Sequence, residues 1–358
     1  MRTSPYDPHR PILLPFPDGW FGVAFSSELK PGQVLRRRLA GEDVVLYRTR
    51  GGRLRGIEPY CPHLGAHLGV GGRVENEDLV CPFHGFAFDP SGACVRTGYG
   101  TAPPARARLV QRHIHEASGM IWVWRHAEGA PPSWNFPEGP GEEHSTYPCS
   151  SFHLLRTYPQ EMLENIVDLG HFGPLHGYSG VRIGDVPPVF DGDTFRAHFI
   201  AERAFPLLGV LTVDLRFRVY GLGCVHFAVE IPRVGVRMLV VAGFTPRNPG
   251  ETEMRMAAYY QKPGLKVVSS PRVRAALQSV VESTSRVLLP QVFRWFEREI
   301  RQDQPIFETK TYLERARPAQ GDGPIMPYRR WASQFYTPPL RSAAAEGPFR
   351  HRLDADEA

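Results

Sequence analysis

The sequence predicts an α+β protein of two domains: an all-β domain, then a domain that packs an antiparallel sheet against a long helix. Three observations lead to this fold class. Short β-rich runs separated by Gly/Pro turns fill residues 22–125, segments of alternating apolar and polar residues fill 212–260, and one helical apolar stripe spans 273–300. With 358 residues, the chain is long enough to build two hydrophobic cores.

The first domain is expected over residues 18–126. Runs such as Val44–Tyr47, Leu79–Val80 and Met120–Trp124 have the composition and length of short strands. Five prolines and three glycines then follow between residues 126 and 150, a composition that is typical of a linker. We therefore place a linker at residues 127–149 and begin the second domain at residue 150.

The second domain is expected over residues 150–336. A helical segment is predicted at 160–171, and four strands follow at 212–219, 225–231, 238–244 and 254–260. Three of these strands alternate with period two, which predicts an antiparallel sheet that is covered on one face. The strand at 238–244 is more continuously apolar, which predicts a central position in the sheet.

A long C-terminal helix should cover this sheet. Ser270 is a plausible N-cap, Pro271 suits the first helical position, and the apolar stripe reaches Ile300 at helical spacing. The last segment, residues 337–358, is rich in proline, alanine and charge, and we expect it to be a mobile tail.

Composition excludes several classes of protein. The net charge is +5 without a dense Lys/Arg block, so no nucleic-acid partner is expected. The sequence contains no run of 18 apolar residues, so no transmembrane helix is expected. Peripheral contact with a membrane is kept as an alternative. Five scattered cysteines do not form a disulfide framework, and we expect a cytoplasmic protein.

Two short loops carry the first group of candidate ligands. They read Cys61-Pro62-His63-Leu64-Gly65 and Cys81-Pro82-Phe83-His84-Gly85. A Rieske-type [2Fe–2S] cluster requires two cysteines on one iron and two histidines on the other, and two such loops supply one of each. Cys61, His63, Cys81 and His84 are therefore the predicted cluster ligands.

Two alternatives apply to these loops. A Cys₂His₂ zinc site uses the same ligand types, although zinc sites usually draw Cys-Cys and His-His pairs from separate knuckles. His67 lies four residues after His63 and could be mistaken for a ligand; we expect it beside the cluster or at the surface.

The second group lies in the segment Glu164–His176. Asp168, His171 and His176 follow one another at D-x₂-H-x₄-H spacing, and the intervening Gly173-Pro174 should break the helix so that both imidazoles converge. Two histidines and one carboxylate form the facial triad of mononuclear non-haem iron. A cluster that transfers electrons must deliver them to an acceptor. Because the chain continues well beyond the cluster domain, a mononuclear iron in the second domain is the expected acceptor.

The third ligand is less obvious in the sequence. Asp303 lies three residues after Ile300 and continues the buried stripe of the long helix. A buried carboxylate needs a partner or a metal ion, which makes Asp303 the first candidate. Glu299, four residues earlier, is the runner-up, and Asp168 could also bind iron. A solvated Asp303 at a fraying helix end is the alternative reading.

These motifs identify a resemblance. Over nearly all its length the chain resembles the oxygenase component of Rieske non-haem iron oxygenases, which implies a helix-grip catalytic domain. The resemblance implies His171, His176 and Asp303 as ligands of Fe(II). It implies Asp168 as the acid that links this iron to His84 of a neighbouring subunit, and Asn165 as a polar residue near the iron.

Segments near the C-terminus are similar to the steroid-processing branch of this family. They are Gln302–Lys310, Asp322–Ile325 and Arg329–Tyr336. That branch includes 3-ketosteroid 9α-hydroxylase oxygenases and cholesterol 7-desaturases, and bacterial sterol C-4 demethylases share the chemistry. The resemblance implies oxidation of a small apolar steroid or sterol by dioxygen, as hydroxylation, desaturation or demethylation. The alternative within the family is a ring-hydroxylating oxygenase that acts on a smaller aromatic compound.

The implied enzyme needs partners. Nothing in the sequence resembles a flavin or nicotinamide site, so a separate NAD(P)H-dependent reductase or a ferredoxin must deliver the electrons. Transfer to a neighbour's iron implies a closed homo-oligomer, and a homotrimer is expected. Two rival classes remain: a Rieske ferredoxin, which would need only about the first 125 residues, and a zinc-stapled binding protein, which would be colourless.

Overall fold

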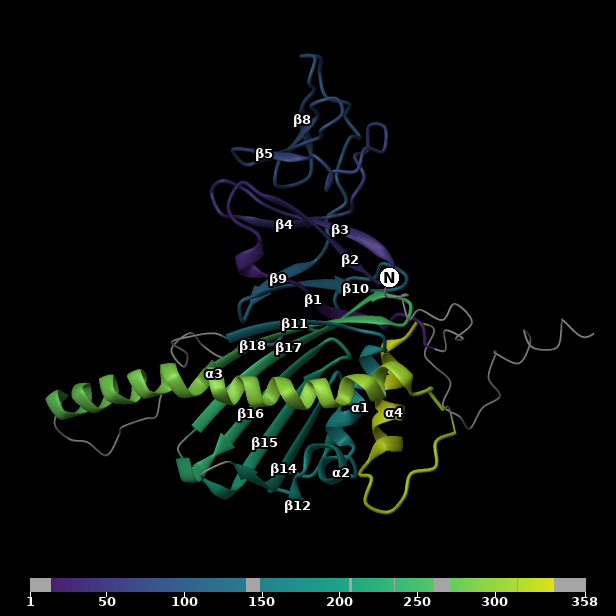
Figure 1. The fold of residues 1–358 in the computed structure, drawn as a ribbon. Helices are drawn as coiled ribbons and strands as arrows, with labels where there is room; N and C mark the ends of the chain where they lie inside the picture. Colours follow the sequence, from purple (N-terminus) through teal and green to yellow (C-terminus); the bar gives the residue numbers. More distant parts are fainter. Residues whose placement is uncertain are drawn as a thin grey trace, which may run out of the picture.

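The computed structural model divides into an N-terminal part and a larger C-terminal part (Figure 1). The structure describes residues 14–139, 149–205, 208–234, 236–260, 271–313 and 315–337, with only the backbone described for 271–289. Ser270, the predicted N-cap, lies outside these residues, as does the predicted tail apart from Thr337. The hydroxyl of Thr337 donates a hydrogen bond to Asp18 at 2.6 Å.

Within the described residues, the N-terminal part consists of three small antiparallel sheets. Their orders are β1-β10-β9, β2-β3-β4 and β5-β6-β7-β8. The strands are β1 (Gly19–Phe25), β2 (Val34–Leu39), β3 (Glu42–Arg48), β4 (Leu54–Ile57), β5 (Arg73–Glu75), β6 (Asp78–Val80), β7 (Ala87–Phe88), β8 (Cys94–Arg96), β9 (Ile114–Ala117) and β10 (Met120–Arg125), and a 3₁₀ turn, η1 (Ser26–Glu28), follows β1. The expected strands at residues 44–47, 79–80 and 120–124 lie in β3, β6 and β10.

One large antiparallel sheet dominates the C-terminal part. Its order is β11-β18-β17-β16-β15-β14-β12, with β13 paired to β14. The strands are β11 (Cys149–Leu155), β12 (Ser179–Ile183), β13 (Val189–Asp191), β14 (Thr194–Phe205), β15 (Gly209–Tyr220), β16 (Cys224–Ile231), β17 (Val236–Asn248) and β18 (Glu251–Tyr260). The four expected strands are β15 to β18, and β17 is central as predicted. The prediction missed the other four, including β14.

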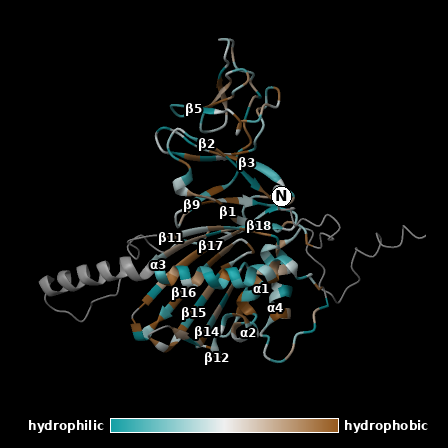
Figure 2. Ribbon diagram, in the orientation of Figure 1, coloured by the Kyte–Doolittle hydropathy of each residue, from teal (hydrophilic) through white to brown (hydrophobic). Residues whose placement is uncertain are grey.

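The helices surround one face of this sheet. They are α1 (Pro159–Val167), α2 (Phe172–His176), α3 (Pro271–Thr309) and α4 (Ile325–Ala332), with short 3₁₀ turns η3 (Pro232–Val234) and η4 (Ser333–Phe335). Helix α3 crosses the sheet (Figure 1), and Phe296 packs on Phe227 with ring centroids 4.8 Å apart. Hydrophobic and hydrophilic positions alternate along the strands beneath it (Figure 2). No described helix is both long and apolar enough to cross a membrane.

The opposite face of the sheet is not free, which corrects the expectation of a sheet covered on one side. Cys224, Val241 and Ala257 are buried in one cluster with Trp122 and other aromatic residues of β1 and β10. The Thr245 hydroxyl also donates to the Gly22 carbonyl at 2.8 Å. The N-terminal part therefore covers the second face at β16–β18, and the continuous apolar run of β17 follows from burial on both sides.

The segment predicted as a linker is partly built into this contact. Phe136 is buried against Trp20 and Trp122, and Trp134 lies against Phe335. Residues 140–148 lie outside the described part of the chain, and Cys149 already begins β11.

Candidate metal centres

The two cluster loops are the same turn formed twice. The amide of Gly65 donates to the carbonyl of Cys61 at 2.9 Å, and that of Gly85 donates to Cys81 at 3.2 Å. Both glycines have left-handed backbones, with φ of 75° and 65°. Other residues rarely adopt this conformation, so glycine lets each loop fold back over its own cysteine.

The four predicted cluster ligands converge between these loops. Cys61 and Cys81 are buried, whereas His63 and His84 lie half-buried, with ring centroids 4.8 Å apart. Burial raises the pKa of the Cys61 thiol to about 11, so a neutral thiol is favoured unless a metal supplies positive charge. Two thiols below and two imidazoles at the rim fit a Rieske [2Fe–2S] cluster.

His67 is not free to bind the cluster. Its Nδ1 accepts the amide of Gly69 at 3.1 Å, so its Nε2 carries the proton and donates to Asp43 at 3.0 Å. Both ring nitrogens are used, and His67 supports the first loop from outside.

The second group of candidates also comes together. His171, His176 and Asp303 each offer one ligand atom, and these atoms lie within 4.8 Å of one another. His171 follows α1, His176 ends α2, and Asp303 lies on α3. The group therefore joins two segments that are 127 residues apart in the sequence.

The break between the two histidines lies earlier than expected. Asp168 to His171 form the turn between α1 and α2, whereas Gly173 and Pro174 lie inside α2. Proline is tolerated there because the amides of a helix's first turn have no intrahelical partner. The expected helix at 160–171 therefore ends at Val167.

Each histidine is held by a carbonyl oxygen. Nδ1 of His171 lies 2.7 Å from the backbone oxygen of Asp168, and Nδ1 of His176 lies 3.0 Å from the side-chain oxygen of Gln302. A carbonyl oxygen can only accept, so both Nδ1 atoms carry the proton. Both Nε2 lone pairs are then available to a metal ion.

The group offers electron-pair donors that face one another, as a bound cation requires. Oδ1 of Asp303 is buried without a hydrogen-bond partner among the described residues, and it lies 3.3 Å from Nε2 of His176. Burial lowers the pKa of His176, but Asp303 and Gln302 raise it by more. A lone pair facing a carboxylate needs a proton or a metal ion between them, and the donor set fits mononuclear iron.

Glu299, the runner-up, lies outside this group. The hydroxyl of Tyr178 donates to its Oε2 at 3.2 Å, and Arg203 forms an ion pair with its Oε1 at 3.0 Å. Burial raises the pKa of Glu299 to about 7. Arg203 also donates to the carbonyl of His176, so Glu299 helps to fix the end of α2.

Asp168 lies beside the group without joining it, and Asn165 lies on α1. The Asp168 carboxylate accepts the Gly170 amide at 3.0 Å and lies 3.5 Å from Nδ1 of His171. Burial raises the pKa of Asp168, but the contacts with His171 lower it by more, so the net shift is downward. Asn165 is half-buried near the end of α1.

Sequence reasoning missed two residues that support the ligands. Gln302 adjoins the predicted Asp303, and its role could have been suspected because histidine ligands usually donate their second N–H to an oxygen. Arg203 lies on β14, which the strand prediction omitted, so no signal pointed to it.

Comparisons with known proteins agree with both halves of the molecule. Residues 19–106 match the Rieske [2Fe-2S] domain family, and residues 123–336 match the 3-Ketosteroid 9alpha-hydroxylase C-terminal domain family. Cholesterol 7-desaturases from Ciona intestinalis and Xenopus laevis are each 30% identical over 90% of this chain, covering 69% and 72% of their own lengths. A 3-ketosteroid-9-alpha-monooxygenase oxygenase component from Rhodococcus rhodochrous is 22% identical over 90% of the chain and 84% of its own.

Solved structures share the fold at lower identity. Dicamba monooxygenase bound to 3,6-dichlorosalicylic acid has a TM-score of 0.63 at 17% identity, covering 91% of this chain and 98% of that one. A Pseudomonas putida NdmA variant with theobromine has a TM-score of 0.62 at 18% identity, covering 87% and 88%. The chain therefore belongs to the Rieske oxygenases with a 3-ketosteroid 9alpha-hydroxylase C-terminal domain, oxidoreductases that carry a Rieske [2Fe–2S] cluster and a mononuclear iron.

Proposed function

We propose that this oxygenase oxidises a steroid or sterol with dioxygen. The observation that carries the proposal is the match of residues 123–336, which hold all the candidate iron ligands, to the 3-ketosteroid 9alpha-hydroxylase C-terminal domain. Relatives named for cholesterol and for a 3-ketosteroid both align over 90% of the chain. Hydroxylation, desaturation and demethylation share this machinery, and the product distinguishes them.

The proposed metal ligands are the two groups of side chains described above. Cys61 and Cys81 hold one iron of the cluster, and His63 and His84 hold the other. His171, His176 and Asp303 hold the mononuclear iron, which supplies reductive activation of dioxygen when bound. The carbonyl oxygens of Asp168 and Gln302 keep each imidazole in the tautomer that binds metal.

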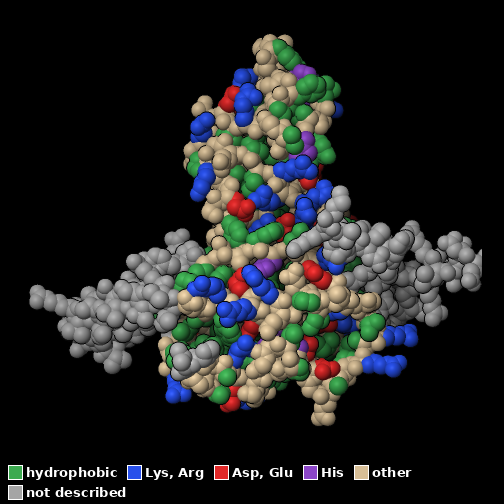
Figure 3. Space-filling view, in the orientation of Figure 1, with side chains coloured by type: hydrophobic (Ala, Val, Ile, Leu, Met, Phe, Trp, Pro, Cys, Tyr) green, Lys and Arg blue, Asp and Glu red, His purple; other side chains and the backbone are tan. Residues whose placement is uncertain are grey.

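Electrons cross between subunits of a closed trimer. The loops around β5–β8 lie at one end of the molecule and α2 lies at the other (Figure 1), so a chain's own centres do not face each other. Hydrophobic and histidine side chains gather at the cluster end (Figure 3), where Leu64 and Phe83 are 66% and 63% exposed. This apolar tip suits packing against the next subunit. Asp168, 31% exposed beside His171, would bridge His171 and the partner subunit's His84, so that the electron passes from the cluster to the mononuclear iron through this contact.

A separate protein reduces the cluster. An oxygenase component works with an NAD(P)H-dependent reductase, either directly or through a ferredoxin. The half-buried imidazoles of His63 and His84 bring the cluster close to the surface, where a donor can approach.

Val225, Phe227 and Val229 of the large sheet are buried in the core of the C-terminal part, and Phe296 packs on Phe227. The carbon that reacts must lie beside the group formed by His171, His176 and Asp303, since oxidation requires contact with the iron centre.

The test is oxygen uptake by the enzyme with both metal centres loaded and a chemical or protein donor. A panel of sterols and 3-ketosteroids is compared with small aromatic acids, and the products are identified by mass spectrometry. We expect coupled uptake with a steroid or sterol that disappears in His171→Ala. Coupled oxidation of an aromatic acid, with no response to any steroid, would refute the substrate class.

A further inference from the structure

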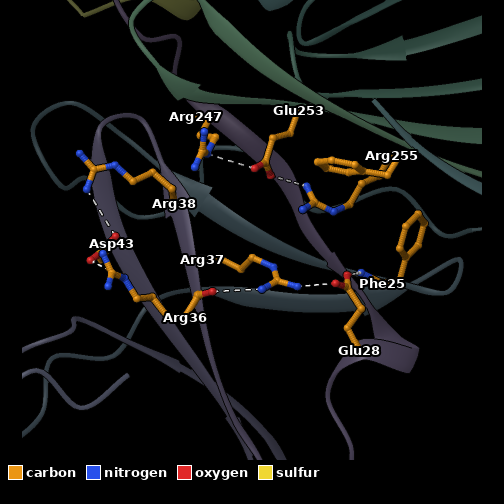
Figure 4. Close-up of a pocket in the computed structure, with 10 residues that line it drawn as sticks. Phe25, Glu28, Arg36, Arg37, Arg38, Asp43, Arg247, Glu253 and Arg255 are labelled. Carbon is orange, nitrogen blue, oxygen red and sulfur yellow. Dashed lines mark hydrogen bonds and ion pairs between the residues drawn. The ribbon is translucent and has the colours of Figure 1, made fainter. Parts of the chain in front are cut away.

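A cavity of about 450 Å³ lies where the N-terminal part meets the large sheet (Figure 4). Asp43 in its lining accepts a hydrogen bond from His67, which supports the first cluster loop, but no predicted metal ligand lines the cavity and the proposed reaction gives it no role. Its lining residues are Phe25, Glu28, Arg36, Arg37, Arg38, Asp43, Phe152, Arg247, Glu253 and Arg255.

The lining carries surplus positive charge. Five arginines face three carboxylates, and the carboxylates are already engaged: Glu28 by Arg37, Asp43 by Arg36 and Arg38, and Glu253 by Arg247 and Arg255. Glu251 contacts Arg247 at 3.5 Å from outside the lining, and counting it still leaves a net positive charge. The cavity therefore favours an anion.

Arg255 gives the most specific indication of a ligand. Its side chain is only 4% exposed, and its Nε is buried without a hydrogen-bond partner among the described residues. Its Nη1 lies 2.8 Å from Glu253 and donates to the Gly22 carbonyl at 3.2 Å. Its guanidinium lies 5.0 Å from the ring centre of Phe152. A buried N–H that lacks an acceptor is costly, so an oxygen from a ligand would complete this side chain.

The cavity draws on both parts of the molecule. Arg36, Arg37 and Arg38 lie on β2, whereas Arg247 and Arg255 lie on β17 and β18. In Figure 4, Arg36 and Arg38 converge on Asp43 and Arg37 extends toward Glu28, while Arg247 and Arg255 both approach Glu253. Next to them, the amides of Ala40 and Gly41 donate to the carbonyls of Pro246 and Arg247 at 2.6 and 2.9 Å. A ligand held by both sets would clamp this junction.

We propose that this cavity binds a small soluble phosphate monoester, with the phosphate between Arg37 on β2 and Arg255 on β18. Guanidinium groups bind phosphate oxygens through paired N–H donors, and a dianion suits the surplus charge. A volume of about 450 Å³ also leaves room for an organic group beyond the phosphate. Phe25 and Phe152 provide the apolar walls for that group.

The experiment is titration calorimetry of the holoenzyme with inorganic phosphate and with glycerol 3-phosphate, at constant ionic strength. We expect saturable binding of one molecule per chain. Arg37→Gln and Arg247→Gln should each weaken it about tenfold, the size of one lost charge-assisted hydrogen bond. Arg255→Lys keeps the charge but removes the Nε donor, and it should weaken binding as well.

Two further variants separate binding from damage to the fold. Glu28→Gln removes a competing carboxylate from Arg37, so it should tighten binding rather than weaken it. Arg237→Gln is the matched control, since Arg237 also lies on β17 and pairs with a glutamate, Glu230, but lies outside the cavity. It should leave affinity unchanged.

Three outcomes would overturn the proposal. They are the absence of saturable binding with either phosphate, equal weakening by Arg237→Gln and Arg247→Gln, and weaker binding in Glu28→Gln. A hexaglutamate peptide is titrated in parallel. If the peptide binds with the predicted variant pattern and the phosphates do not, the cavity is part of a docking surface for an acidic protein.

Discussion

The two metal centres are built in opposite ways. Each cluster loop is a short turn that places a cysteine and a histidine within three residues of each other, and the turn occurs twice. The iron group instead needs the turn after α1, the end of α2 and a residue near the end of α3. The cluster site is encoded locally, whereas the iron site depends on how a 39-residue helix packs across the sheet.

This difference determines how much of the structure a substitution at each centre should disturb. Damage to a cluster loop should stay within the core that contains Cys61 and Cys81, which is separate from the core of the large sheet. The iron site shares its supports, such as Arg203 and Glu299, with the packing of α2 and α3. The variants below test this contrast, beginning with the largest effect.

Loss of one cluster ligand should abolish the cluster. Cys81→Ser or His84→Ala leaves a cluster iron with three ligands, so the Rieske absorption and electron paramagnetic resonance signals should disappear while the mononuclear site still loads iron. Cys94→Ser is the control, because Cys94 packs against the same core as Cys61 and Cys81, but its Sγ donates to the Arg96 carbonyl at 3.6 Å and not to a predicted cluster ligand. A normal Rieske spectrum in either ligand variant would refute the assignment.

At the iron site, two neighbouring substitutions should differ in kind. His171→Ala should reduce mononuclear iron to background, because it removes a ligand. Asp168→Asn keeps the backbone carbonyl that orients His171, so it should retain both metal centres but lose most turnover, leaving the cluster reduced. Iron content and the cluster's redox state during turnover are measured together. If Asp168→Asn loses iron as His171→Ala does, Asp168 is a ligand.

Gln302 tests whether the support of a ligand matters. Gln302→Leu removes the oxygen that holds Nδ1 of His176, so iron affinity should fall roughly 10- to 100-fold. Gln304→Leu is the control, since the side-chain amide of Gln304 donates to Glu308 on the same helix at 3.0 Å and not to a predicted iron ligand. Dialysis against a graded iron chelator measures the change. Equal affinities in the two variants would mean that α3 positions His176 without help from this hydrogen bond.

The last expected effect is on acid stability, away from both centres. Burial lowers the pKa of His226 on β16 to about 4, with Arg218 adding to the shift. The unfolded chain takes up this proton below pH ~6.5 and the folded chain resists it, so stability should fall as pH drops and level off below pH ~4. The loss should reach up to about 3 kcal/mol.

Denaturant unfolding at several pH values measures that loss. His226→Gln should flatten the decline between pH 6.5 and 4, whereas replacing the exposed His113 by Gln should not. The cluster absorption should persist in this pH range, since His226 lies in the C-terminal part. An unchanged decline in His226→Gln would show that another group is responsible.

The contrast also explains what the sequence could predict. Cys61, His63, Cys81 and His84 were recognisable as candidate cluster ligands because the chemistry lies within each loop. Asp303 was accessible as a candidate iron ligand through the helical period of α3, which extends the buried stripe. Fold class, the central position of β17 and the start of α3 at Pro271 followed from periodicity and turn signals.

The rest depended on tertiary contacts. Strand β14 alternates inward at Phe195, Ala197, Phe199 and Ala201, but alanine is a weak strand signal, so the strand and its Arg203 were overlooked. Burial of the second sheet face, and with it the isolated Nε of Arg255, arises only when the N-terminal part docks. Periodicity within one segment carries no information about such contacts.

The placement of the two candidate metal centres at opposite ends of the molecule has a genetic consequence (Figure 1). Subunits with Cys81→Ser keep a working iron site, and subunits with His171→Ala keep a working cluster, so each alone is inactive for a different reason. In a ring that passes electrons to the next subunit, a random equal mixture restores roughly a quarter of the productive junctions. Two variants that are inactive alone would then restore oxygenase activity when mixed. If electrons passed within one subunit, the mixture would have no activity.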